Sequence, residues 1–169
     1  PETRHKSESE RLTMGLLSNL TAEKGLFRLI NLNARLEARD IDTEALLAGP
    51  INDSRERGEA ERQIARSGGR VTHLGPVYGA DKEAFFASLH LFVFPSEYPT
   101  ETLPLVLAEA LVRGVPVLAT SRGCIPSFGG SDAVHVVPPC EDFLASASDW
   151  IARNEAALRS GELGKVAQA

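Results

Sequence analysis

The fold is decided by LFVFPSEYPTETLPLVLAEALVRGVPVLAT, residues 91–120. Two short apolar runs, LFVF and VPVLA, flank a segment whose apolar residues recur at helical spacing. Strands that are buried on both faces are apolar almost throughout, and such strands are typical of parallel sheets covered by helices. The stretch therefore predicts a strand at Leu91–Phe94, a helix at Pro104–Val112 and a second strand at Pro116–Ala119.

The same alternation of apolar runs and amphipathic segments continues in both directions. Further strands are predicted at Thr13–Ser18, Glu44–Ala48, Arg70–Leu74 and Ala133–Val137. Further helices are predicted at Lys24–Glu37, residues 55–69, Lys82–Leu89 and Glu141–Leu158. We therefore expect an α/β fold: a doubly wound, Rossmann-like parallel sheet of about six strands with helices on both faces. In such a sheet, ligands bind beyond the carboxyl ends of the strands.

Length and charge limit the possible classes. A chain of 169 residues has the size of one domain, and 43% hydrophobic residues suffice for one core. Residues 1–11 are charged and aperiodic, which is typical of a linker or cut end, and residues 12–169 form the expected domain. The net charge of -5, with 18 basic and 23 acidic side chains spread along the chain, argues against a nucleic-acid partner.

Membrane, disulfide and metal signals are weak in this sequence. The longest apolar runs are far shorter than the roughly 20 residues that a membrane helix needs. Cys124 and Cys140 are the only cysteines, too few for a disulfide scaffold, so we expect reduced thiols and a cytoplasmic location. The 4 histidines lie far apart in the sequence, and no metal site is expected.

The strongest chemical signal is Glu109, the single polar residue of the segment PLVLAEALV. A helix that is apolar nearly all round is expected to be buried on most faces. An ionised carboxylate in it needs strong partners, unless it lies on a narrow solvent-exposed stripe or caps a neighbouring loop. Thr102 or Leu103 is predicted to cap this helix, with Pro104 in its first turn. The free N–H groups at the helix start then face the ligand crevice, where they favour an anion such as a diphosphate.

A second carboxylate, Glu101, lies just ahead of the predicted helix. Glu101 and Glu109 are expected to flank a phosphorylated ligand at either end. Carboxylates accept hydrogen bonds from hydroxyl groups, so a sugar is a natural ligand.

Residues 95–120 resemble the Glu-x7-Glu signature of glycosyltransferase family 4, a retaining group with the GT-B fold. Other segments follow in the order of that family. LLSNLTAEKG (residues 16–25) is similar to its first donor-domain loop, which is usually Gly-Arg-Leu followed by a Lys-Gly pair. LLAGP (46–50) and VTHLGPVYGADKEAFFASLHLFVFPS (71–96) come next, and SRGCIP (121–126) is similar to its Gly-Gly-Ile-Pro turn. The resemblance covers most of the chain.

The resemblance implies roles for the acidic residues and for one lysine. Glu101 contacts hydroxyls of the transferred sugar, and Glu109 binds the ribose hydroxyls of the nucleotide. Lys24 neutralises the leaving diphosphate, and Gly25 allows a tight turn into the helix. Glu101 and Lys24 are therefore the expected catalytic residues. The alternative for Lys24 is an exposed lysine at a helix start, which the helix dipole disfavours.

The remaining site residues follow from the same resemblance. The backbone of Thr102, Leu103 and Pro104 matches the family's Gly-Phe-Gly, and because proline has no N–H, Leu103 and Leu105 are the expected hydrogen-bond donors. Asn19 aligns with the usual Arg, so one phosphate-binding charge is missing. Tyr78, together with the backbone near Val77, is expected to border the base, or else to pack under the loop.

These residues imply the donor-binding domain of a retaining, metal-independent glycosyltransferase, with a UDP- or GDP-type sugar as donor and no cofactor. Its expected partner is an N-terminal acceptor-binding domain of the same protein, absent from this chain, through which any peripheral membrane contact would be made. The alternative is a non-catalytic glycosyltransferase-like interaction module, for which Asn19 is the only hint. A dinucleotide-dependent oxidoreductase is disfavoured, because SNLTAEKG (residues 18–25) lacks the G-x-G-x-x-G turn.

Overall fold

The protein, seen in a computed structural model, is described over residues 11–99, 101, 104–129 and 131–167. A six-stranded sheet has the order β3-β2-β1-β4-β5-β6, and every neighbouring pair is parallel. The strands are β1 (Leu12–Leu17), β2 (Thr43–Ala48), β3 (Val71–Gly75), β4 (Leu91–Phe94), β5 (Val117–Thr120) and β6 (Val134–Val137). The order reverses between β1 and β4, as in a doubly wound sheet, so the predicted fold class is confirmed.

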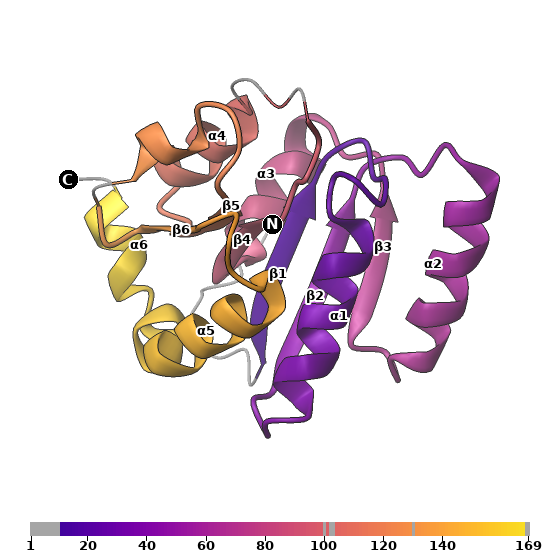
Figure 1. The fold of residues 1–169 in the computed structure, drawn as a ribbon, viewed down its shortest axis with the longest axis horizontal. Coiled ribbons are helices and arrows are strands. Elements are labelled where there is room, and N and C mark those ends of the chain that lie inside the picture. Colours follow the sequence, from indigo (N-terminus) through magenta and orange to yellow (C-terminus); the bar gives the residue numbers. More distant parts are fainter. Residues whose placement is uncertain (1–10, 100, 102–103, 130, 168–169) are drawn as a thin grey trace.

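Helices cover both faces of this sheet. The helices are α1 (Leu26–Glu37), α2 (Ser54–Arg66), α3 (Gly79–Ser88), α4 (Leu105–Val112), α5 (Phe143–Ser160) and α6 (Glu162–Ala167), with a short 3-10 helix, η1 (Ile125–Phe128). Figure 1 shows α1 and α5 in front of the sheet and α3 and α4 behind it. α1 packs on β2 and α5, whereas α4 packs on β4 and β5 and is also contacted by α6.

The core is built from the apolar runs that the sequence predicts as strands. All residues of β4 and β5 are buried. Phe86 of α3 packs on Phe92 of β4, with ring centroids 5.8 Å apart, and Phe92 stacks on Phe94. This aromatic column fixes α3 against the centre of the sheet, and α3 carries one side of the site described below.

Two glycines bring the site loops close together. Gly25, at the start of α1, has a φ of 94°, and a Cβ atom there would lie 2.4 Å from Pro95 Cγ. Gly49, after β2, has a φ of 120°, and a Cβ atom there would lie 1.8 Å from the carbonyl oxygen of Ser18. Side chains are rarely compatible with such angles and contacts. The expected tight turn at Gly25 is therefore confirmed, and the loops after β1, β2 and β4 pack against one another.

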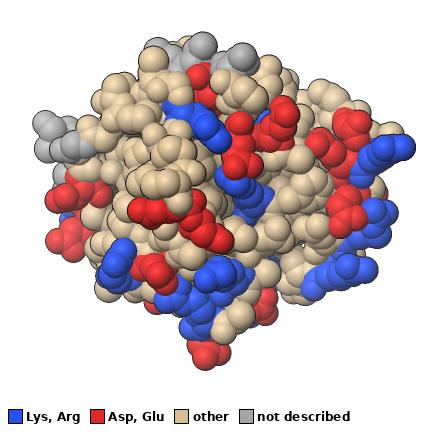
Figure 2. Space-filling model, viewed as in Figure 1, with Lys and Arg blue, Asp and Glu red and all other residues tan. Residues whose placement is uncertain are grey.

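The surface carries charges of both signs. In the view of Figure 1, acidic and basic side chains are interspersed over the molecule, without a continuous basic track on this face (Figure 2). Among the described helices, none combines the length and apolar character needed to cross a bilayer.

Candidate functional site

The loops that leave the carboxyl ends of β1 and β4 bring Lys24 and Glu101 together, although 77 residues separate them in the sequence. Lys24 Nζ lies 2.7 Å from Glu101 Oε2. The Glu101 side chain is only 9% exposed and the Lys24 side chain 20%. Ser96 Oγ donates to the same carboxylate oxygen at 2.8 Å, and Lys24 Nζ lies 4.1 Å from the centre of the Tyr98 ring. The Glu101 carboxylate is therefore held between two donors.

The segment around Ser96 is fixed by several hydrogen bonds to neighbouring elements. Thr120 Oγ1, at the end of β5, donates to the carbonyl oxygen of Ser96. The N–H of Tyr98 donates to Ser96 Oγ at 3.2 Å, and the N–H of Glu97 donates to the carbonyl oxygen of Glu23 at 2.7 Å. The β4–α4 loop is thereby attached to β5 on one side and to the β1–α1 loop on the other. This is the local reason why Glu101 meets Lys24.

A second lysine–glutamate pair lies on the helices behind the sheet. Lys82 Nζ of α3 lies 2.8 Å from Glu109 Oε1 and 2.7 Å from Glu109 Oε2 of α4. The two side chains are 28% and 36% exposed. Glu109 is therefore partly exposed to solvent. It also has the strong partner that the sequence analysis expects for an ionised carboxylate in this helix.

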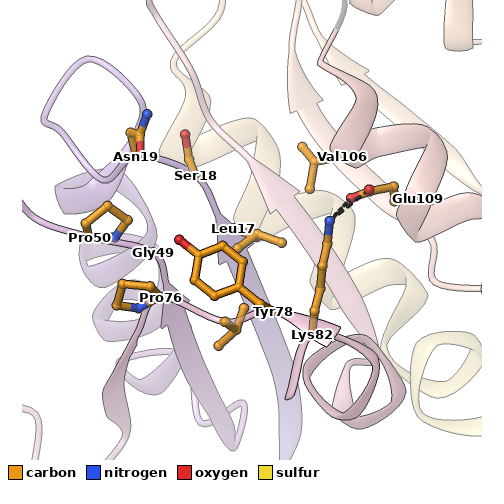
Figure 3. Close-up of a pocket in the computed structure, with 11 residues that line it drawn as sticks. Leu17, Ser18, Asn19, Gly49, Pro50, Pro76, Tyr78, Lys82, Val106 and Glu109 are labelled. Atoms are coloured by element: carbon orange, nitrogen blue, oxygen red, sulfur yellow. Dashed lines mark hydrogen bonds and ion pairs between the residues drawn. The ribbon is translucent and has the colours of Figure 1, made fainter. Parts of the chain in front are cut away.

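A pocket of about 250 Å³ opens beside this pair and is called the Glu109 pocket. It is lined by Leu17, Ser18, Asn19, Gly49, Pro50, Pro76, Val77, Tyr78, Lys82, Val106 and Glu109. Figure 3 shows Lys82 extending from α3 toward Glu109, with Asn19, Pro50 and Pro76 across the pocket. Three of the predicted donor-binding residues, Asn19, Tyr78 and Glu109, thus share one pocket.

A second hollow, of about 490 Å³, lies on the other side of Asn19 and is called the Lys24 pocket. It is lined by Asn19, Thr21, Glu23, Lys24, Asp53, Glu56 and Tyr98. Asn19 is exposed and lines both pockets. The residue that departs from the family pattern therefore lies between the two lysine–glutamate pairs.

Tyr78 immediately precedes α3, and its side chain borders the Glu109 pocket. Tyr78 is 76% exposed. The alternative that this tyrosine packs under its loop is therefore wrong. An exposed aromatic ring at the edge of a pocket is free to stack on a flat ligand group.

Helix α4 differs from the prediction in its starting residue and in its burial. Pro104 is the residue before the helix, with a ψ of 98°, and the helix begins at Leu105. Leu105 is 68% exposed and Val112 is 70% exposed, so the expectation that α4 is buried on most faces is wrong. Only Leu107 and Ala110 of this helix are fully buried. The predicted contacts of Thr102 and Leu103 lie outside the described residues.

Lys82 lines the Glu109 pocket and contacts Glu109, and sequence reasoning missed it. The sequence places it at the beginning of a predicted helix and gives it no role. The available signal was Glu109 itself, because a carboxylate on an apolar helix needs a cation nearby. The sequence does not show which residue of α3 faces α4. The position of the cation could therefore not be predicted. Within the described residues, no group of His, Cys, Asp and Glu side chains is arranged to hold a metal ion.

The fold defines the class of protein: the architecture is that of the C-terminal domain of a GT-B glycosyltransferase. The chain belongs to the glycosyl transferases group 1 family, which it matches over residues 2–165. No curated protein sequence gives a significant match.

Solved structures similar to this chain come from several bacteria. HepE from Anabaena, solved in complex with UDP-glucose, is 25% identical with a TM-score of 0.75, and the match covers 94% of this chain and 43% of HepE. Sucrose-phosphate synthase from Thermosynechococcus elongatus is 22% identical with a TM-score of 0.74, over 94% and 40% of the two chains. The C-terminal domain of the group 1 protein LpcC from Francisella tularensis is 17% identical with a TM-score of 0.75, over 99% and 94%. The chain thus spans less than half of the first two proteins.

Proposed function

We propose that this chain is the donor-binding domain of a retaining, metal-independent glycosyltransferase of family 4. It binds a nucleotide-diphosphate sugar, of UDP or GDP type, and the sugar is transferred to an acceptor held by an N-terminal domain of the same protein. The observation that carries the proposal is the Lys24–Glu101 contact of 2.7 Å at the strand ends, beside the start of α4. HepE, which is solved with UDP and with UDP-glucose, supports this assignment.

The Lys24–Glu101 pair supplies two different interactions to such a donor. A carboxylate that is 9% exposed and already held by Ser96 accepts hydrogen bonds from sugar hydroxyls in a fixed direction. The ammonium group of Lys24 stabilises the negative charge that grows on the leaving diphosphate. The first N–H groups of α4 lack partners within the helix and add to this stabilisation. Glu101 thus orients the sugar while Lys24 stabilises the departing group.

The Glu109 pocket receives the nucleoside in this proposal. Glu109 accepts hydrogen bonds from the ribose hydroxyls, and the exposed ring of Tyr78 borders the base. Asn19, between the two pockets, lies beside the diphosphate. An amide makes weaker hydrogen bonds to phosphate than a guanidinium does, so Lys24 and the start of α4 carry most of the charge stabilisation.

In the resembled family, the leaving phosphate takes the proton of the acceptor hydroxyl on the same face of the sugar. The anomeric configuration is then retained without a protein nucleophile. In this chain the residues contribute by holding and stabilising charge rather than by forming a covalent bond.

The decisive experiment is calorimetric titration of the chain with UDP, GDP, ADP and NAD. We expect one of the nucleoside diphosphates to bind most tightly, and NAD to bind weakly or not at all. Preferential binding of NAD would contradict the donor-site assignment. Loss of binding to all four would favour the alternative of a non-catalytic interaction module, for which the neutral Asn19 is the specific observation.

A further inference from the structure

Lys82 contacts the carboxylate that the proposed function assigns to the ribose. We infer that Lys82 is a positioning residue, which fixes the Glu109 carboxylate in the direction needed to bind a pair of ribose hydroxyls. The inference rests on the proposed function, because it concerns the same pocket. Its basis is the contact of one ammonium group with both carboxylate oxygens, at 2.8 and 2.7 Å.

A contact of this kind limits the conformations of a flexible side chain. Glutamate has three rotatable side-chain bonds, and an exposed glutamate samples many rotamers. With both oxygens bound to Lys82 Nζ, the Glu109 carboxylate can no longer turn freely. The pair is only about one third exposed at Glu109, so water competes incompletely with the lysine. Preorganised acceptors bind more tightly because their ordering cost precedes ligand binding.

The neighbouring ion pair of the same two helices has a different task. Arg113, directly after α4, donates to Glu83 of α3 through Nε at 2.9 Å and through Nη2 at 2.5 Å. This hydrogen bond lowers the pKa of Glu83 below its ordinary value. Neither Glu83 nor Arg113 lines the Glu109 pocket. The Glu83–Arg113 pair therefore ties α3 to α4 without facing the ligand.

The two ion pairs have opposite polarity between α3 and α4. On α3 the cation Lys82 is next to the anion Glu83, whereas on the α4 side the anion Glu109 lies four residues before the cation Arg113. The backbone carbonyl of Glu109 accepts from Arg113 Nη1 at 2.7 Å, so the arginine binds the main chain rather than the carboxylate. The carboxylate of Glu109 is thus left to Lys82, and Glu83 provides a matched control on the adjacent position of the same helix.

The test compares two ligands across a set of variants. UDP and 2′,3′-dideoxy-UDP share the base and the diphosphate, but the second lacks both ribose hydroxyls. We expect the wild-type chain to prefer UDP by about tenfold or more, the worth of charge-assisted hydrogen bonds to a carboxylate. Glu109→Gln should reduce that preference. Lys82→Met should reduce it to a similar extent, with little change in the affinity for dideoxy-UDP.

Conservative and control variants separate positioning from simple helix packing. Lys82→Arg keeps a cation that can hold both carboxylate oxygens, and it should retain most of the preference for UDP. Glu83→Gln weakens the contact between α3 and α4 outside the pocket, and it should retain the full preference. If Lys82→Met does not fold, Lys82→Gln, which keeps a donor for one oxygen, replaces it and should show a partial loss.

The outcomes distinguish this inference from the proposed function. Suppose that the wild-type chain prefers UDP to dideoxy-UDP, that Glu109→Gln removes this preference and that Lys82→Met keeps it. The inference is then overturned while the proposed function stands. Equal losses in Glu83→Gln and Lys82→Met would also overturn it, because helix packing would then explain both. If the wild-type chain does not discriminate between the two ligands, the proposed role of Glu109 fails first.

Discussion

The two lysine–glutamate pairs have nearly equal contact distances but different surroundings. Lys24 and Glu101 come from two loops, and Glu101 is 9% exposed with a further bond from Ser96. Lys82 and Glu109 come from two helices, and Glu109 is 36% exposed. Removing one partner from the first pair leaves a buried charge with too few partners, whereas water can reach the remaining partner of the second. The first pair should therefore affect both stability and binding, and the second mainly binding.

Loss of Lys24 should have the largest effect on nucleotide binding and on stability. Lys24→Met is expected to weaken UDP binding by about a hundredfold, because it removes a partly buried cation from the diphosphate. The affinity for UMP should fall less. The free energy of unfolding should also drop by about 2 kcal/mol, since Ser96 would be the one side-chain donor to Glu101 left among the described residues. Calorimetric titration and chemical denaturation measure the two quantities.

A matched control for Lys24 is Arg62→Met, which removes a cation from an exposed pair with Glu59 on α2. It should change neither nucleotide binding nor stability appreciably. If Lys24→Met binds UDP as the wild type does, the assignment of Lys24 to the diphosphate is wrong.

Glu109 gives the next largest effect and tests the other side of the comparison. Glu109→Ala should weaken nucleotide binding by about tenfold to a hundredfold, the worth of a charge-assisted hydrogen bond. The fold should be little affected, because Lys82 would keep access to water. The same titrations, with thermal unfolding, check both statements. A variant that unfolds instead would assign Glu109 a structural role and remove the contrast between the pairs.

Asn19 lies between the two pairs and offers a gain of function. Asn19→Arg should strengthen UDP binding by up to about tenfold, because a guanidinium can form bidentate, charge-assisted bonds to phosphate. The gain for UMP should be smaller, and Asn19→Gln should show none. Unchanged UDP binding in the arginine variant would mean that the diphosphate does not cross from one pocket to the other at Asn19.

Much of the fold could be predicted from local sequence signals. The apolar runs at β4 and β5 predicted strands buried on both faces, and every predicted strand exists with bounds shifted by a few residues at most. Gly25 predicted a tight turn, which its φ of 94° confirms. These features depend on neighbours in the sequence, so a single sequence reveals them.

The parts that could not be predicted depend on distant contacts. The short helix α6 contains Gly164, which is unfavourable in a helix. A Cβ atom at Gly164 would lie 2.1 Å from the carbonyl oxygen of Gly114, so this glycine is required by the close approach of two chain segments. Lys82 was missed for the same reason, because its partner lies on another helix. The exposed Leu105 and Val112 show that an apolar helix need not be buried all round.

The smallest expected effect concerns pH and a ring contact that lies outside both lysine–glutamate pairs. His135 of β6 stacks on Trp150 of α5, with ring centroids 4.9 Å apart. Burial, and then the positive charge of Arg153, lower the pKa of His135 below its ordinary value of 6.5, while Glu141 opposes this. The folded state thus binds a proton at His135 less readily than the unfolded chain does. The stabilisation is present above pH 6.5 and is lost as the pH falls through the lowered pKa of the folded state.

His135→Phe keeps a ring against Trp150 and should lose less stability than the wild type between pH 7 and pH values below 6.5, as measured by urea denaturation at each pH. If both proteins lose stability equally over that range, the acid response does not originate at His135.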